Sequence, residues 1–277
     1  MNRGTAAIRS AFADGKAFIP FITCGDPDLE TTKEIVRAMA EAGASLIELG
    51  IPFSDPTAEG PTIQEANLRA LSGGVTTDKI FAMVRQLRQG EGEQVPPVEV
   101  PMVFMTYANV VYSYGTERFL DQCVACGIDG LILPDVPFEE KEDFAPALRA
   151  RDMALISLVA PTSEDRISRI AQEADGFLYV VSSLGVTGVR SAITTDIGAI
   201  VRKAKEAAAA CGREDLPCAV GFGISTPEQA AKMAAQADGV IVGSAIVKLI
   251  AEYGKAAPAY VALYVRRMKE AMLTGRY

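Results

Sequence analysis

Histidine is absent from this chain of 277 residues. Without it, the protein cannot form the Ser/His and Cys/His pairs that activate many catalytic nucleophiles. Metal sites that use imidazole ligands are excluded for the same reason. Acid–base chemistry must therefore come from carboxylate, Tyr, Lys or Cys side chains, and we predict no metal site.

Cysteine is scarce too, and the five residues show no spacing typical of a disulfide framework. Cys123 and Cys126 form a CxxC pair, but a structural zinc site needs four ligands. We interpret the cysteines as reduced thiols that pack as small apolar groups.

Long hydrophobic runs and a basic charge are also missing. No apolar run approaches the roughly 20 residues that a membrane span needs, and residues 1–15 lack the apolar segment of a signal peptide. The net charge of −8 argues against nucleic-acid binding, which depends on clustered Lys and Arg. We therefore expect a cytoplasmic protein that binds neither nucleic acid nor membrane.

Eight short apolar runs alternate with longer segments of helical period. Residues 163–174 are typical of the helical segments, because their apolar side chains recur at i, i+3, i+4 and i+7. Thr226, Pro227 and Gln229 have the residue types of a helix start, with an N-cap, an N1 proline and an N3 partner. The runs that we predict as strands are Ala17 to Thr23, Leu46 to Ile51, Val100 to Thr106, Gly130 to Pro134, Met153 to Val159, Phe177 to Ser182, Cys218 to Phe222 and Gly239 to Val242.

This alternation predicts an α/β fold. Near-continuous apolar strands joined by helices indicate a parallel sheet that is covered on both faces. Eight such units in one chain favour a single-domain (β/α)8 TIM barrel over residues 1–277, with an extra N-terminal helix. An open, doubly wound sheet is the alternative. We expect long βα loops after strand 2, at Pro52 to Gly74, and after strand 6, at Ser183 to Thr195, on the face where barrels place active sites.

Glu48 is out of place in the second apolar run. By the period of two residues in a strand, Glu48 shares a face with Leu46, whereas Ile47 and Leu49 share the other face. Both faces of a barrel strand are covered, so this carboxylate is predicted to be enclosed. A buried charge raises its pKa or finds a partner, which leaves two readings: an ion pair at the barrel end, or a catalytic acid or base.

Three more carboxylates follow predicted strands at the same end. Asp55 precedes a proline and is explained as a turn residue. Glu59 is either a solvated loop charge or part of a site. Asp135 ends the fourth strand, where we expect it to cap the helix that begins near Glu139 or to bond loop backbone.

Glycine-rich turns follow the sixth, seventh and eighth strands, at residues 185–188, 221–225 and 243–245. Backbone amides in such turns, with a helix opening at Ser244, can hold an anion without Lys or Arg. Barrels often carry a phosphate site in this place. One such turn alone is explained by chain reversal, but three converging turns favour phosphate binding.

The order of these motifs resembles the tryptophan synthase α chain family over nearly the whole sequence. The stretch Glu48 to Pro56, which reads ELGIPFSDP, is specific to that family. The other matching motifs are Phe21 to Pro27, Tyr107 to Asn109, Pro134 to Pro137, Gly185 to Gly188, Gly221 to Ser225 and Gly243 to Lys248.

The resemblance implies a retro-aldol cleavage of indole-3-glycerol phosphate to indole and D-glyceraldehyde 3-phosphate. Glu48 would be the general acid and base, and Glu59 would bond the indole N–H, although the family usually has Asp at that position. The substrate phosphate would bind Gly188, Gly223, Gly243 and Ser244. The implied indole pocket consists of Phe21, Tyr107, Ile132, Tyr179 and Thr187.

The resemblance also implies a partner, the pyridoxal-phosphate β subunit of tryptophan synthase, in an α2β2 tetramer. Asp55, Pro56 and Asn109 lie on loops that would face this partner. No cofactor is implied for the chain itself. Two alternatives remain: a weakly active subunit that mainly regulates its partner, or another phosphate-binding TIM-barrel enzyme.

Overall fold

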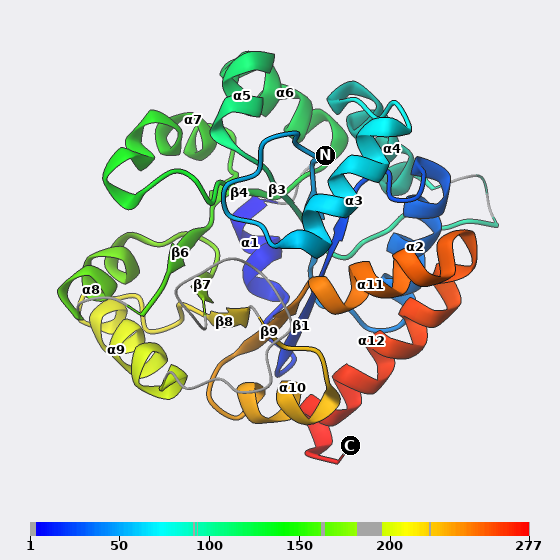
Figure 1. The fold of residues 1–277 in the computed structure, drawn as a ribbon. Helices are drawn as coiled ribbons and strands as arrows, with labels where there is room; N and C mark the ends of the chain where they lie inside the picture. The colour runs from blue at the N-terminus through cyan, green and yellow to red at the C-terminus, as the bar shows by residue number, and fades with distance from the viewer. Residues whose placement is uncertain are drawn as a thin grey trace.

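A computed structural model describes residues 4–90, 92, 94–161, 164–181, 196–221 and 223–276. Its strands form a central ring that helices surround, as Figure 1 shows along the axis of the ring. The strands are β1 (Ala17–Thr23), β2 (Ile47–Gly50), β3 (Met102–Met105), β4 (Gly130–Ile132), β5 (Ala154–Leu155), β6 (Ser157–Val159), β7 (Leu178–Val181), β8 (Cys218–Gly221) and β9 (Gly239–Val242).

The strands pair in parallel in the order β5-β4-β3-β2-β1-β9-β8-β7-β6. The predicted fifth strand, Met153 to Val159, is broken at Ile156 into β5 and β6. β5 pairs with β4 and β6 pairs with β7, while the Ile156 amide donates to the Leu131 carbonyl at 2.9 Å. The break therefore joins the two ends of the sheet, and the predicted (β/α)8 barrel is confirmed.

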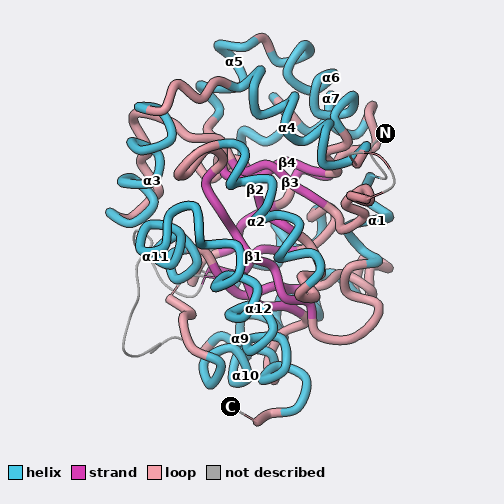
Figure 2. Tube along the Cα trace, turned by 90° about the vertical axis from the view of Figure 1, so that its right-hand side faces the viewer, coloured by secondary structure: helices cyan, strands magenta, loops and turns pink. Residues whose placement is uncertain are grey.

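Most of the helices lie outside the ring between successive strands, as Figure 2 shows from the side, and others precede the first strand or follow the last. Among the described residues, none of these helices combines the length and the apolar character that crossing a membrane requires. They are α1 (Gly4–Ser10), α2 (Leu29–Glu41), α3 (Pro61–Ser72), α4 (Thr77–Gln89), α5 (Ala108–Tyr114), α6 (Thr116–Cys126), α7 (Ala145–Arg149), α8 (Glu164–Glu173), α9 (Ile197–Ala209), α10 (Pro227–Ala234), α11 (Ser244–Tyr253) and α12 (Ala257–Thr274), with 3-10 turns η1 (Phe138–Asp143) and η2 (Gly254–Ala256).

Two predictions about loops have different outcomes. The segment Pro52 to Gly74 was predicted as one long loop, and this was wrong in its second half, which is helix α3. Pro61 occupies the first turn of α3, where its missing N–H costs nothing. The predicted loop Ser183 to Thr195 lies outside the described residues. The capping box of Thr226 and Gln229 at the start of α10 is confirmed.

Alternate residues of each strand face two different apolar clusters. Ile47 and Leu49 belong to the cluster that packs between the strands and the outer helices, as the period of two predicts. Leu46 belongs to a second cluster, with Val103 and Ile132, that fills the inside of the ring. The barrel is therefore a packed core and not a pore.

The extra N-terminal helix α1 closes one end of the ring, the end at which the strands begin. Its Ile8 is fully buried in the inner cluster. A Cβ atom at Gly130, the first residue of β4, would lie 3.0 Å from Cδ1 of Ile8, so glycine makes room for this plug. In Figure 2, α1 lies on the side of the barrel opposite α3 and α11.

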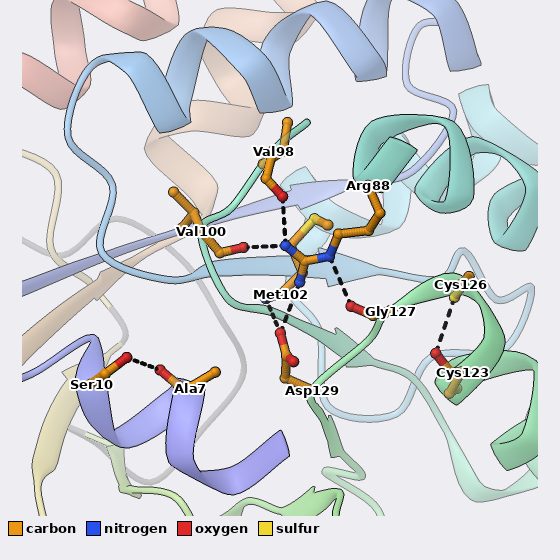
Figure 3. A network of polar contacts seen from close by, with 10 residues as sticks. All are labelled: Ala7, Ser10, Arg88, Val98, Val100, Met102, Cys123, Cys126, Gly127 and Asp129. Carbon is orange, nitrogen blue, oxygen red and sulfur yellow. Dashed lines mark hydrogen bonds and ion pairs between the residues drawn. The ribbon is translucent and has the colours of Figure 1, made fainter. Parts of the chain in front are cut away.

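A polar network around Arg88 stabilises the end of the barrel at which the strands begin (Figure 3). Arg88 of α4 forms an ion pair of 2.8 Å with Asp129, which is fully buried just before β4. Asp129 also accepts from the amide of Met102 at 3.0 Å, so both charges are hydrogen-bonded. Nε of Arg88 donates to the carbonyl of Gly127 at 2.9 Å. Nη1 donates to the carbonyls of Val98 at 2.7 Å and Val100 at 2.8 Å.

Cys123 and Cys126 lie buried on α6 as free thiols, and the Cys126 thiol donates to the Cys123 carbonyl at 3.3 Å. Burial raises the pKa of both thiols, that of Cys126 to about 12. They are therefore neutral and packed, which agrees with the interpretation of the CxxC pair as apolar groups.

Candidate active site

The carboxyl ends of the strands lie at one end of the barrel, which we call its mouth, and Glu48 lies near this end on β2. In the register of the sheet, Glu48 is the neighbour of Phe21 on β1 and of Val103 on β3. Only 1% of its surface is exposed. The prediction that this carboxylate is enclosed is therefore confirmed.

The environment of Glu48 favours its protonated form. Among the described residues, its Oε2 atom has no hydrogen-bond partner. Burial first, and the charge of Glu59 second, raise the pKa of Glu48 from an ordinary 4.5 to about 8. The ion-pair reading of Glu48 finds no counter-charge within this described part of the chain. The side chain can therefore carry a proton at neutral pH, as a general acid requires.

Glycines on neighbouring strands let two aromatic rings enter the mouth. A Cβ atom at Gly50 would lie 2.6 Å from Cζ of Phe21, and one at Gly243 would lie 3.2 Å from its Cδ1. A Cβ atom at Gly221 would lie 2.6 Å from Oη of Tyr179. Any larger residue at Gly50 or Gly221 would push a ring out of place.

The pocket residues predicted on the strands come together around Glu48. Tyr179 on β7 is 5% exposed, and burial together with the charge of Glu48 raises the pKa of its hydroxyl. Ile132, at the end of β4, packs with Tyr179 in the inner cluster. Phe21 packs in a third apolar cluster, with Ile63 of α3 and Val247 of α11. The structure thus places Phe21 and Tyr179 beside the Glu48 carboxyl, with Ile132 in the same cluster as Tyr179.

Glu59 lies at the rim of the mouth, directly before helix α3. It is 9% exposed, so the reading of a solvated loop charge is wrong. Asn67 of α3 donates from Nδ2 to Oε2 of Glu59 at 2.7 Å. Burial raises the pKa of Glu59 to about 7, against the opposing effect of the Asn67 hydrogen bond. Two coupled carboxyls therefore face this site.

Tyr107 links the loops that surround Glu59. Its hydroxyl accepts from the amide of Ala58 at 3.1 Å, and its ring contacts Phe53 with centroids 5.2 Å apart. Burial raises the pKa of Tyr107 to about 12, so the hydroxyl stays neutral. The next amide, that of Ala108, donates to both carboxylate oxygens of Asp135 at 3.1 Å. Asp135 therefore bonds backbone, but at the first residue of helix α5, so the prediction of a bond to loop backbone or a cap near Glu139 was wrong in its place.

Of the three residues predicted to face a partner from loops, Asp55 and Pro56 lie on the loop before α3, whereas Asn109 is in the first turn of helix α5. Asp55 and Asn109 are exposed, and Pro56 is half-buried. The Ser54 hydroxyl donates to Asp55 at 2.5 Å, in keeping with the turn predicted there. These positions are accessible to a second protein, and their role in an interface stays a prediction.

The residues predicted to bind phosphate are only partly within the described chain. Gly243 is the N-cap of α11, and Ser244 is the first residue of that helix. The first amides of a helix have no acceptor within it, so they point outward as anion donors. Gly223, after β8, has φ +77, a left-handed conformation that favours glycine. Gly188 and the pocket residue Thr187 lie outside the described residues.

Sequence reasoning missed three polar side chains near the mouth. The Oγ1 atoms of Thr23, at the end of β1, and of Thr106, after β3, are buried without a partner among the residues described. Asn67 was missed because the prediction treated its helix as loop. The signal for it was a polar residue in an apolar stripe of helical spacing. In the described chain, no group of three His, Cys, Asp or Glu side chains is placed to hold a metal ion.

The fold and this arrangement define a class, a (β/α)8 barrel with two enclosed carboxyls at its C-terminal mouth. The family model described as tryptophan synthase alpha chain matches residues 9–272. The chain is 48% identical over 270 residues to a tryptophan synthase alpha chain of Lactiplantibacillus plantarum, covering 97% of each chain. The protein therefore belongs to the tryptophan synthase alpha chain family and is a subunit of an enzyme.

Solved structures agree with this assignment. A tryptophan synthase alpha chain from Legionella pneumophila has a TM-score of 0.82 and 36% identity, with 98% of this chain and 97% of that chain covered. A chain from a Pyrococcus furiosus structure, described as a tryptophan synthase a2b2 complex, has a TM-score of 0.80 and 35% identity. It covers 92% of this chain and 98% of its own.

Proposed function

We propose that this chain is a single-domain lyase subunit of cytoplasmic tryptophan biosynthesis. Its reaction is the retro-aldol cleavage of indole-3-glycerol phosphate to indole and D-glyceraldehyde 3-phosphate. The observation that carries the proposal is Glu48, a carboxyl enclosed at the mouth of a barrel of this family, with a pKa raised to about 8. Such a group can both give and take a proton near neutral pH.

Glu48 performs the two proton transfers. Its protonated carboxyl donates to C3 of the indole ring, which converts the ring to a cationic indolenine. The carboxylate then takes the proton of the glycerol hydroxyl next to the scissile bond while the carbon–carbon bond breaks. The electron pair of that bond returns to the indole ring, the hydroxyl carbon becomes the aldehyde, and Glu48 is protonated again.

Glu59 stabilises the cationic ring. Its carboxylate accepts from the indole N–H, whose positive charge grows when C3 is protonated. Its charge also helps to raise the pKa of Glu48, so the two carboxyls have different roles in one site. The enclosed position of Glu59, 9% exposed, makes this charge effective because little water screens it.

The rest of the site binds the two ends of the substrate. Phe21, Tyr107, Ile132, Tyr179 and Thr187 hold the indole ring. Phe21 is the neighbour of Glu48 in the sheet, and Tyr179 lies close enough for the Glu48 charge to raise its pKa. The phosphate binds the backbone of Gly188, Gly223 and Gly243 and the amide and hydroxyl of Ser244. The start of α11 supports this part of the proposal, because a helix N-terminus attracts anions.

The partner that we propose is the β subunit of tryptophan synthase, which carries pyridoxal phosphate, in an α2β2 assembly. The Pyrococcus furiosus relative, described as an a2b2 complex, supports this arrangement. Asp55 and Pro56, on the loop after β2, and Asn109, in the first turn of α5, would contact the partner. A contact there would connect the partner directly to the loop that carries Glu59.

The test is indole release from indole-3-glycerol phosphate by the purified chain, with and without a tryptophan synthase β subunit. Glu48→Gln is the matched control, since it keeps the size of the side chain and removes its proton. We expect turnover that rises with the partner and vanishes in Glu48→Gln, while calorimetry shows that this variant still binds substrate. Absent turnover in both states with substrate bound would overturn the lyase proposal in favour of a regulatory subunit.

A further inference from the structure

Helix α3, which follows Glu59, is held to the barrel at two places. Arg69 donates two hydrogen bonds of 2.8 Å to the carboxylate of Asp26, which is 2% exposed in the loop after β1. Ile63 and Ala66 pack with Phe21 in a buried apolar cluster. Bidentate charged bonds and buried apolar contacts fix the orientation of a helix. The side chains on its inner face therefore have fixed positions relative to the mouth.

The backbone of the loop that carries Glu59 has its own supports. Gln64 donates from Nε2 to the Glu59 carbonyl at 2.7 Å. The amide of Ala58 donates to the hydroxyl of Tyr107 at 3.1 Å. Neither contact involves the Glu59 carboxylate, so both supports of the loop remain when the side chain of Asn67 is changed.

Asn67 acts on the carboxylate itself. It is 3% exposed and donates to Oε2 of Glu59 at 2.7 Å. Of the described side chains, it is the one that donates to this carboxylate. A donor to a buried carboxylate favours its ionised form, and one bonded oxygen leaves the other oxygen to accept from a second donor.

We propose that Asn67 is a positioning residue of the cleavage reaction, which orients the Glu59 carboxylate toward the substrate ring and keeps it charged. The proposal rests on the function proposed above. It also explains how a glutamate can serve at a position where the family usually has Asp. The longer side chain reaches a donor on α3, and an Asp carboxylate would end about 1.5 Å short of the same place.

The experiment compares Asn67→Leu, Asn67→Asp and Gln64→Leu in the complex of the chain with the β subunit. Asn67→Leu removes the donor, and Asn67→Asp keeps the size of the side chain but adds a like charge. Gln64→Leu is the matched control, because it removes an amide donor from the same helix that reaches the carbonyl of Glu59 and not its carboxylate. Circular dichroism and thermal unfolding check that each variant is folded.

We expect Asn67→Leu to lower kcat about tenfold, with KM changed less than about twofold, because a buried acceptor loses its partner. The acidic limb of the pH profile should move to higher pH, further in Asn67→Asp than in Asn67→Leu, since repulsion adds to the lost bond. Gln64→Leu should leave this limb in place. In a Glu59→Ala background, Asn67→Leu should change kcat less than about twofold.

Two results would overturn the proposal: an acidic limb that stays in place in both Asn67 variants, or an undiminished effect of Asn67→Leu when Glu59 is already Ala. Either would make Asn67 a structural residue only. A second readout does not depend on activity. A 13C NMR titration of Glu59 in the chain alone should show a higher pKa in Asn67→Leu than in wild type. This titration tests the role of Asn67 even if the chain does not cleave indole-3-glycerol phosphate, so the two proposals can fail separately.

Discussion

The two ends of the barrel bury charge in opposite ways. At the end where the strands begin, Arg88 and Asp129 are enclosed together, and their charges are matched and hydrogen-bonded (Figure 3). At the mouth, Glu48 is enclosed as deeply, but its Oε2 atom has no partner within the described chain. Burial of a charge is therefore no sign of function by itself. A better sign is a buried polar atom that the fold leaves unpaired at the end where barrels place their active sites.

The largest expected effect comes from Glu48→Leu, which removes the unpaired carboxyl at the mouth. Cleavage should fall about 10²- to 10⁴-fold, because the proton donor is lost. The fold should become more stable by about 1–3 kcal/mol at pH 8, because an unpaired buried polar group is removed. Urea unfolding and indole release measured on the same preparation check both effects. A variant that loses stability together with activity would show that Glu48 supports the fold.

That gain in stability should depend on pH. The pKa of Glu48 is about 8 in the folded chain and near 4.5 when the chain is unfolded. The folded state therefore binds more protons between these values, and wild-type stability falls as pH rises through this window. Glu48→Leu should gain most above pH 8 and least near pH 5. An equal gain at both pH values would mean that ionisation of Glu48 is not the cause.

Arg88→Met tests the opposite end of the barrel. It should lower the free energy of unfolding by about 3–5 kcal/mol, because Asp129 stays buried without its counter-charge. The kcat of the folded variant should stay within about twofold of wild type, since the network lies at the end opposite the mouth. Arg85→Met is the control on the same helix, where one contact of 3.3 Å to Gln122 is lost. A large drop in kcat for Arg88→Met would show that the two ends are coupled.

Glu59→Asp tests the second carboxyl at the mouth. The shorter side chain loses the bond of 2.7 Å from Asn67, so kcat should fall about tenfold. Stability should change by less than about 1 kcal/mol, because the loop keeps its contacts to Gln64 and Tyr107. Steady-state kinetics and urea unfolding measure the two quantities. An unchanged or higher kcat would show that Asn67 and the glutamate are not matched.

The smallest expected effect is the change of wild-type activity with pH. Cleavage needs Glu59 ionised, with a pKa of about 7, and Glu48 protonated, with a pKa of about 8. Activity should therefore rise as pH approaches 7, reach its maximum between 7 and 8, and fall above 8. Glu59→Gln should remove the acidic limb. A flat profile from pH 6 to 9 would contradict the assignment of these two carboxyls.

Local sequence patterns were enough for the strands and for Glu48. Apolar runs with a period of two place Leu46 inside the ring and Ile47 outside it, and Glu48 follows from the same alternation. The capping box at Thr226 is equally local, since its bonds span three residues. Such features were predictable because their causes lie within a few residues of each other.

Helix α3 could have been predicted but was not. Pro61 at its first turn and buried Ile63, Ala66 and Ala70 give the usual helical signal. The turn formers before it, which include Asp55, Pro56 and Gly60, favoured a loop. With the helix missed, Asn67 had no assigned face, and its contact with Glu59 could not be inferred.

The remaining features depend on residues far apart in the chain. Arg88 and Asp129 are separated by 41 positions, so no local pattern pairs them. The break at Ile156 arises because one strand must reach both β4 and β7 to close the ring. A linear pattern indicates that Met153 to Val159 is extended, and it carries no information on which neighbours each half takes.

The most direct test of the central claim is a 13C NMR titration of the Glu48 carboxyl in the purified chain, assigned by loss of its signal in Glu48→Gln. A carboxyl enclosed without a partner should remain protonated at pH 7 and titrate with a pKa of about 8. A carboxyl that titrates near its ordinary value of 4.5 would be solvated or paired, and Glu48 would then not be the proton donor of this site.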